Sequence, residues 1–221
     1  MSASKWRDTD DKVTNSRREL IEYIRGYRIM SKQKNDRQTN LTRGIRVEIA
    51  SLVYNLIEVV VSVTVGLLTG SAALVSWGLD STVEATSAGT LIWRLKAEKD
   101  GGDKRTVLHR KKVALYVVAC AFWIVVAAIL YEAVSAFISQ EAPGFNWWGI
   151  AILFVSLVVN PLLAWGKYRY GKRLDSPALK YDAKDTMICE YQTVVVLAGI
   201  GLTQWMGWWW ADPVAALLIV P

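Results

Sequence analysis

The sequence predicts an all-α membrane protein, a bundle of six transmembrane helices with both termini in the cytosol. Most charged residues gather in three segments, at residues 1–46, 94–112 and 167–185, and the stretches between these segments are mainly apolar. The longer apolar stretches reach the ~20 residues that a helix needs to cross a hydrocarbon core of about 30 Å. We therefore divide the chain into a leader at residues 1–46 and a transmembrane domain at residues 47–221.

The leader is polar and basic, and we expect a cytosolic, partly disordered segment. Its string RRELIEYIRGYRIM, at residues 17–30, could form one short amphipathic helix. The N-terminal string MSASKWRDTDDKVTNSRREL is too polar to provide the apolar core of a cleavable signal peptide. The first span would then serve as its own insertion signal.

Six spans follow the leader. The first two are expected to form a tight antiparallel hairpin, because only the small-residue turn TGSAA separates them. The last segment is shorter than a full span. It would be either a short sixth helix or the start of a helix that continues beyond Pro221. The predicted spans are about 47–68, 74–93, 113–138, 147–165, 179–203 and 208–221.

The positions of the basic residues predict the orientation of the bundle. Both internal basic segments lie on the side of the basic leader, whereas the loops after the first, third and fifth spans contain no lysine or arginine. The positive-inside rule places both termini in the cytosol. Tryptophans gather at the opposite ends of the spans, as expected for an interfacial belt. Since no organelle signal is visible, we expect the plasma membrane.

The composition excludes several classes of protein. The net charge is +6, but the basic residues flank apolar spans, so membrane topology explains them better than nucleic-acid binding does. Both cysteines fall inside apolar stretches, which argues against a disulfide framework. We find no phosphate-binding glycine loop, nucleophile elbow or Cys/His zinc knuckle. We therefore expect no enzyme activity and no permanently bound cofactor.

Two pairs of potential ligands lie inside the spans. Asp80 and Glu84 stand at positions i and i+4 of the second span, and Asp185 and Cys189 have the same spacing in the fifth. This spacing places both members of a pair on one helix face. Glu84 and Cys189 also lie at a similar depth, ~20 Å from the outer ends of their spans. A carboxylate inside a bilayer costs about 2.5 to 3.5 kcal/mol on insertion scales, so these acids must face the bundle interior.

Together the four residues could form a four-coordinate metal site. Such a site suits Zn²⁺, which takes oxygen, nitrogen and sulfur ligands in a tetrahedron, and the thiolate would also suit Cd²⁺. Asp182 could replace Asp185 as a ligand. Glu58 and Glu132 have no spaced companion, so proton transfer, helix packing and an accessory site all remain open for them, with packing or an accessory role favoured. We expect Cys120 in the core rather than at the metal.

The strings GSAALVSWGLDSTVEATSA and WWWADPVAALLIVP resemble the second and sixth helices of the cation diffusion facilitators, and the resemblance extends from about Ile49 to Pro221. In that family the second helix carries two metal ligands four residues apart, which fall here on Asp80 and Glu84. The matching motif of the fifth helix falls on Asp185 and Cys189 when Thr193 is aligned with the small polar residue one turn later. The cysteine departs from the family pattern.

The resemblance implies a proton-coupled antiporter that moves a divalent cation out of the cytosol, working as a homodimer of six-helix protomers in a lipid bilayer. Zinc is the first candidate, and cadmium, cobalt, manganese and iron are possible. It also implies a short form without the cytosolic C-terminal metal-sensing domain that many members carry. The alternative hypothesis is a non-transporting membrane protein that binds metal or a partner subunit through its intramembrane acids.

Overall fold

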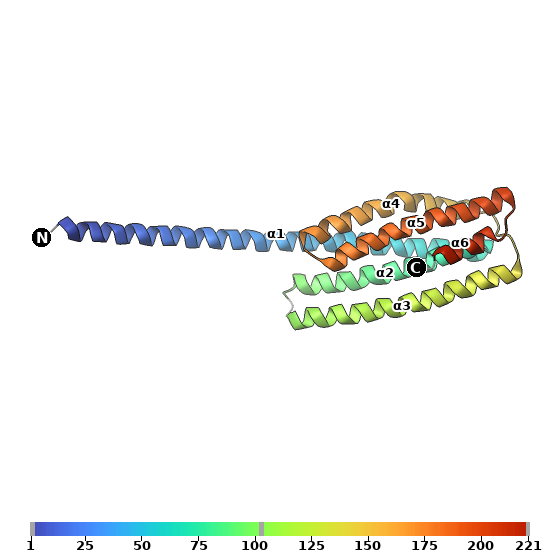
Figure 1. The fold of residues 1–221 in the computed structure, drawn as a ribbon, viewed down its shortest axis with the longest axis horizontal. Coiled ribbons are helices and arrows are strands. Elements are labelled where there is room, and N and C mark those ends of the chain that lie inside the picture. The colour runs from blue at the N-terminus through green and yellow to red at the C-terminus, as the bar shows by residue number, and fades with distance from the viewer. Residues whose placement is uncertain (1–2, 102–103, 220–221) are drawn as a thin grey trace. The chain divides into compact units, whose positions relative to one another are not determined.

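The computed structural model describes residues 3–101 and 104–219, with side chains described from residue 22 onward except at several positions between 104 and 114 (Figure 1). Within these residues the chain forms six α-helices and no strand. The helices are α1 (Ala3–Thr69), α2 (Ala72–Lys99), α3 (Lys104–Ser139), α4 (Trp147–Arg173), α5 (Pro177–Met206) and α6 (Ala211–Ile219). By their contacts the residues divide into two units, Met1–Asn40 and Leu41–Pro221. The second unit is the helical bundle.

Four of the described helices are long and apolar enough to cross a membrane: Glu22–Thr69, Leu115–Ser139, Trp147–Arg173 and Pro177–Met206. Their outward faces carry large apolar side chains. Exposure of these side chains to water would be unfavourable, whereas the hydrocarbon core of a bilayer would cover them. Examples on α3, α4 and α5 are Tyr116, Trp123, Ile124, Tyr131, Phe154, Val158, Leu162, Ile188, Tyr191 and Val194. The prediction of an all-helical membrane bundle is confirmed.

The other two helices differ from these four. Helix α2 has 28 residues but carries acids and serines, and most of its side chains are buried. It packs against α3, α5 and α6, so its polar residues face protein instead of lipid. Helix α6 is only 9 residues long in the described part of the chain, which is shorter than a full span.

The leader differs from its prediction. Residues 3–40 are helical and belong to α1, whereas the sequence predicts partial disorder and one short helix there. The polar stretch after Met30 contains lysine, glutamine and arginine and has no proline or glycine before Gly44. These residues have good helix propensity, so no local feature ends the helix there.

Small residues let α1 and α2 approach each other closely. A side chain at Gly78 of α2 would collide with Ser62 and Val63 of α1, and one at Gly66 of α1 would collide with Val75 of α2. The predicted hairpin is therefore present, with Ser71 capping the start of α2 by accepting a hydrogen bond from the backbone N–H of Leu74.

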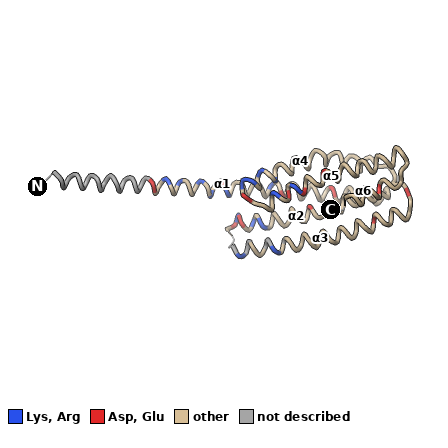
Figure 2. The backbone as a smooth tube through the Cα atoms, viewed as in Figure 1, with Lys and Arg blue, Asp and Glu red and all other residues tan. Residues whose placement is uncertain are grey.

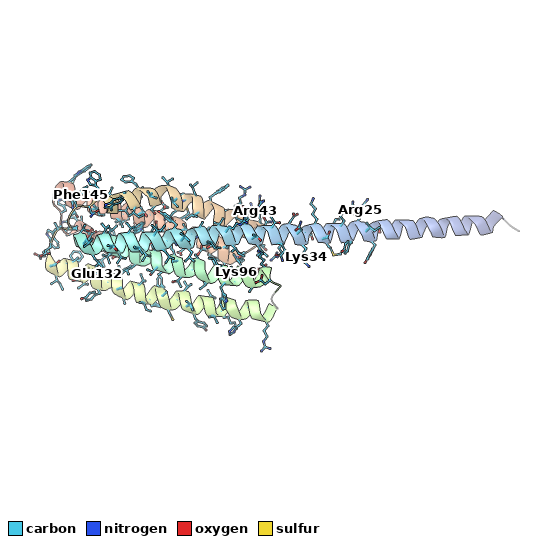
Figure 3. All side chains as sticks on the ribbon, turned by 180° about the vertical axis from the view of Figure 1, so that it is seen from behind. Arg25, Lys34, Arg43, Lys96, Glu132 and Phe145 are labelled. Carbon is cyan, nitrogen blue, oxygen red and sulfur yellow. The ribbon has the colours of Figure 1, made fainter. Side chains whose placement is uncertain are left out.

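Within the bundle unit the two ends have different chemistry. Figure 2 shows lysines and arginines where α2 ends and α3 begins and where α4 ends and α5 begins, including Lys96, Lys99, Lys172 and Arg173. Figure 3 shows Lys96 and Arg43 at this end and Glu132 and Phe145 at the other. The tryptophans Trp147, Trp148 and Trp205 are exposed and belong to the helix ends that meet at the second end.

Candidate metal centre

Helices α2 and α5 bring three potential metal ligands together in the interior of the bundle. One oxygen each from Asp80 and Glu84 and the Sγ atom of Cys189 all lie within 4.8 Å of one another. The three residues are buried, with exposures of 8%, 4% and 1%. Around a tetrahedral zinc, ligand atoms are separated by ~3.3 to 3.8 Å, given bond lengths of about 2.0 to 2.3 Å. Small side-chain rotations would therefore close this cluster around a cation.

A hydrogen bond between the two helices holds this geometry. The indole Nε1 of Trp77 donates to Oγ1 of Thr193 over 3.1 Å, and both side chains are fully buried. Trp77 lies one turn before Asp80 and two turns before Glu84 in the chain, and Thr193 lies one turn after Cys189. The Thr193 hydroxyl also donates to the carbonyl oxygen of Cys189 over 2.9 Å. The hydrogen bond between Trp77 and Thr193 thus fixes how the ligand-bearing faces of α2 and α5 pack against each other.

Helix α1 contributes a stripe of buried polar residues that faces the same interior. They recur at intervals of three and four residues, which is the spacing of one helix face. All are fully buried: Glu48, Ser51, Asn55, Glu58 and Ser62. Of these five residues the sequence analysis assigned possible roles only to Glu58, although the spacing of the polar residues in the apolar helix would have revealed the stripe.

Asn55 of this stripe contacts the candidate site. Its Nδ2 donates to Oε2 of Glu84 over 3.3 Å. The described residues provide no hydrogen-bond partner for Oδ1 of Asn55 or Oε1 of Glu84, and both atoms are buried. Two acceptor atoms with unused lone pairs therefore lie beside the cluster.

Asp185, the fourth predicted ligand, lies outside this group. It is exposed and lines a cavity of about 630 Å³ between α2, α3 and α5, together with Ser87, Leu115 and Ile188. Position 185 is rotated away from the buried face of α5, whose members follow a three–four spacing. That face includes Asp182, Thr186, Cys189, Thr193 and Val196.

Asp182, the alternative to Asp185, makes other contacts in this structure. Its Oδ2 lies 2.6 Å from Nζ of Lys167 in a buried ion pair, and its Oδ1 accepts a hydrogen bond from Ser87 over 2.6 Å. Lys167 also donates to Thr186 over 3.0 Å. The sequence analysis assigned Lys167 to a basic boundary segment, because a lysine at the end of an apolar span usually reaches toward water.

The remaining predicted positions have other surroundings. Glu58 accepts hydrogen bonds from Ser81 over 3.3 Å and from Asn160 over 3.5 Å, which fits a role in helix packing. Glu132 is partly buried and lines a separate cavity of about 210 Å³. Cys120 is exposed on α3, so the expectation of a core position was wrong. Because α3 is apolar on every face, its sequence does not reveal which side is buried.

Comparison with known proteins gives two matches. Residues 49–220 match a family model described as the cation efflux transmembrane domain. The chain is also 31% identical over 153 residues to a protein of Synechocystis sp. (strain ATCC 27184 / PCC 6803 / Kazusa) that carries the name of an uncharacterized transporter. The matched region covers 68% of this chain and 49% of that protein. This chain therefore spans about half the length of the curated relative it matches.

Proposed function

Because this chain belongs to the cation efflux family, a family of membrane transporters, we propose that it is a secondary transporter that exchanges a divalent metal cation for protons. It is an integral membrane protein, and its four apolar helices agree with that assignment. The observation that carries the proposal is the buried cluster of Asp80, Glu84 and Cys189 between α2 and α5. A site in the interior of a membrane bundle suits a cargo that is bound from one side and released to the other.

The same residues account for coupling to protons. A carboxylate or a thiol must lose its proton before it binds a metal, so cation binding releases protons and cation release allows them to return. Alternating exposure of one site would then produce antiport without a separate proton pathway. The direction that we propose is out of the cytosol.

The donor set supports a preference among cations. A thiolate favours Zn²⁺ and Cd²⁺ over Mn²⁺, which prefers oxygen ligands. We propose Zn²⁺ as the principal cargo, with Cd²⁺ also accepted. The cavity beside Asp185 would provide access to the site, with Asp185 as an early contact for the cation.

The arrangement in the cell is part of the same proposal. The basic end of the bundle would face the cytosol, in agreement with the positive-inside rule. The exposed tryptophans at the other end would lie at the outer interface. We propose a homodimer in the plasma membrane as the working form.

The test is cation flux in proteoliposomes that contain a metal-sensitive dye. Zn²⁺, Cd²⁺, Co²⁺, Mn²⁺ and Fe²⁺ are supplied with and without a pH gradient to the wild type, Asp80→Asn and a matched control, Asp175→Asn. Asp175 is an acid whose side chain is 94% exposed, and asparagine tolerates its positive φ of 48°. We expect gradient-dependent Zn²⁺ flux in the wild type and the control and no flux in Asp80→Asn.

Two results would count against transport. If the inserted wild type binds Zn²⁺ but moves no cation, the alternative of a non-transporting metal-binding membrane protein is favoured. If Asp80→Asn transports as well as Asp175→Asn, the cluster between α2 and α5 is not the cation site.

A further inference from the structure

The cavity of about 630 Å³ beside Asp185 has an apolar part and a basic part. Its volume lies within the range of about 300 to 1,000 Å³ that is typical of small-molecule sites. Two basic side chains, Arg94 of α2 and Lys184 of α5, line one part of it. The apolar lining includes Leu91, Leu115, Val118 and Ile188. The cavity therefore suits a ligand that is itself amphipathic.

The two parts of the cavity follow the order of a lipid leaflet. Arg94 lies five residues before the end of α2 and Lys184 seven residues after the start of α5, so both are within ~11 Å of the basic end of the bundle (Figure 2). Leu91 and Ile188 lie one turn further toward the other end of their helices. A phospholipid in the leaflet at the basic end has the same order, with its phosphate outside and its acyl chains inside.

The charges that line the cavity favour an anion. Nζ of Lys167 lies 2.6 Å from Oδ2 of Asp182 and neutralises that carboxylate, so Asp185 is the lining acid that remains to offset Arg94 and Lys184. One positive charge is left, which a phosphate diester with one negative charge would balance. Nε of Arg94 is buried and has no hydrogen-bond partner among the described residues. A guanidinium is well shaped to bind phosphate oxygens.

The cavity is accessible from the bilayer. Leu115, Tyr181 and Ile188 line it and are also exposed on the outer surface of α3 and α5. These helices are the ones whose outward faces carry large apolar side chains for contact with lipid. An acyl chain can therefore enter the cavity sideways, without crossing the interior of the protein.

We propose that this cavity binds one anionic phospholipid of the cytosolic leaflet, with its phosphate between Arg94 and Lys184 and an acyl chain against the apolar wall. Basic pockets between helices at the cytosolic end are a known form of lipid recognition. The inference rests on the membrane orientation proposed above but not on the identity of the cargo. Because Asp185 lines the same cavity, the lipid and an entering cation would occupy it in turn.

The experiment counts the lipids bound to the whole protein by native mass spectrometry from detergent, in a buffer without metal. Phosphatidylglycerol, which is anionic, and phosphatidylcholine, which is zwitterionic, are added with the same acyl chains. The charge variants are Arg94→Gln and Lys184→Gln. Their matched controls are Arg169→Gln and Lys180→Gln, which change exposed cations at the same end of the bundle that do not line the cavity.

A second pair of variants tests the place of binding without changing any charge. Val118→Trp puts an indole into the apolar part of the cavity. Val117→Trp is the matched control, because Val117 is the neighbouring residue on α3, is 44% exposed and lies outside the cavity lining. The melting temperature of each variant in detergent shows whether the fold is kept.

We expect the wild type to bind one phosphatidylglycerol about fivefold or more tightly than phosphatidylcholine, because each basic residue near an anionic lipid contributes about fivefold. Arg94→Gln and Lys184→Gln should each weaken phosphatidylglycerol binding by about fivefold, and the double variant should no longer prefer it. The two control variants should stay within about twofold of the wild type. Val118→Trp should lose the bound lipid and Val117→Trp should keep it.

The proposal is overturned if the wild type binds both lipids equally, if Arg94→Gln binds phosphatidylglycerol as Arg169→Gln does, or if Val118→Trp keeps the lipid. A lipid-free dimer that Val118→Trp dissociates would also overturn it, because a second copy of the chain would then cover the cavity. Since the assay contains no metal, a failure of cation flux in proteoliposomes would remove the proposed function and leave the lipid result unchanged.

Discussion

Lys167 of α4 and Asp182 of α5 form an ion pair inside the membrane bundle, with Nζ 2.6 Å from Oδ2 and side-chain exposures of 1% and 4%. The pair is extended by hydrogen bonds to Thr186 of α5 and Ser87 of α2. It therefore connects three helices. Asp182 and Cys189 lie seven residues apart on the same buried face of α5. The ion pair of Lys167 and Asp182 therefore also fixes the position of the ligand-bearing helix α5 against α4.

Removing one member of this pair should destabilise the bundle strongly. In Lys167→Met the buried carboxylate of Asp182 loses its counter-charge, and breaking a buried pair typically costs about 3 to 5 kcal/mol. We expect a clear fall in the melting temperature in detergent. The double variant Lys167→Met/Asp182→Asn should recover part of the loss, because it leaves no unpaired buried charge.

The exposed pair of Lys180 and Asp175 provides the control for this prediction. Its atoms are 3.0 Å apart, but the side chains are 33% and 94% exposed. Surface pairs contribute about 0 to 1 kcal/mol, so Lys180→Met should melt close to the wild type. If Lys167→Met and Lys180→Met lowered the melting temperature equally, burial of the Lys167–Asp182 pair would add nothing to stability.

The hydrogen bond between Trp77 and Thr193 should support both stability and cation affinity. Thr193→Val keeps the shape of the side chain but leaves the buried indole N–H without an acceptor, at a cost of about 1 to 3 kcal/mol. We expect a lower melting temperature and weaker Cd²⁺ binding, because this bond fixes α2 against α5 beside the cluster.

Thr90→Val is the matched control for Thr193→Val. The hydroxyl of Thr90 donates within α2 to the carbonyl of Ser87 and joins no second helix. If both valine variants had the same small effect on cation affinity, the hydrogen bond between Trp77 and Thr193 would not support cation binding.

The fold could be predicted from sequence because hydropathy and charge report directly on lipid contact. The position of Asp80 and Glu84 on one face also followed from their spacing alone. The helical leader could not be foreseen from its polarity, since a polar segment can be helical or disordered according to its propensity and surroundings. The exposure of Cys120 could not be foreseen either, because the sequence of an apolar helix does not reveal which face contacts lipid.

The site was predicted less completely than the fold. Asp185 and Cys189 have the spacing of a ligand pair, yet the buried face of α5 passes through Asp182 and Cys189 and leaves Asp185 exposed. The pairing of Lys167 with Asp182 depends on how α4 packs against α5, which spacing within one helix does not specify. The stripe on α1 was within reach of sequence reasoning, because its polar residues recur with helical spacing.

Substitution of Cys189 should change which cation the protein prefers. Cys189→Ser replaces a soft thiolate with a weak neutral oxygen ligand, so affinity should fall most for Cd²⁺, less for Zn²⁺ and least for Mn²⁺. Bound Co²⁺ should lose the absorption band that arises from its bond to sulfur. Competition binding in detergent measures the ranking. Cys120→Ser is the control, because Cys120 is exposed on α3. An unchanged ranking in Cys189→Ser would exclude the thiolate as a ligand.

Cation binding should release protons and should weaken as the pH falls. Each ligand that is protonated in the empty site must lose its proton when the cation binds, so lower pH favours the empty, protonated form. For each proton released, affinity should fall by about tenfold for each pH unit below neutrality.

Calorimetry in buffers of different ionisation enthalpy counts the protons released on cation binding. Glu84→Gln should release fewer protons than the wild type because glutamine carries no ionisable proton. Glu132→Gln should release the wild-type number, because Glu132 lies outside the cluster. Affinity that stays constant between about pH 6 and about pH 8 would contradict exchange of protons for the cation at this site.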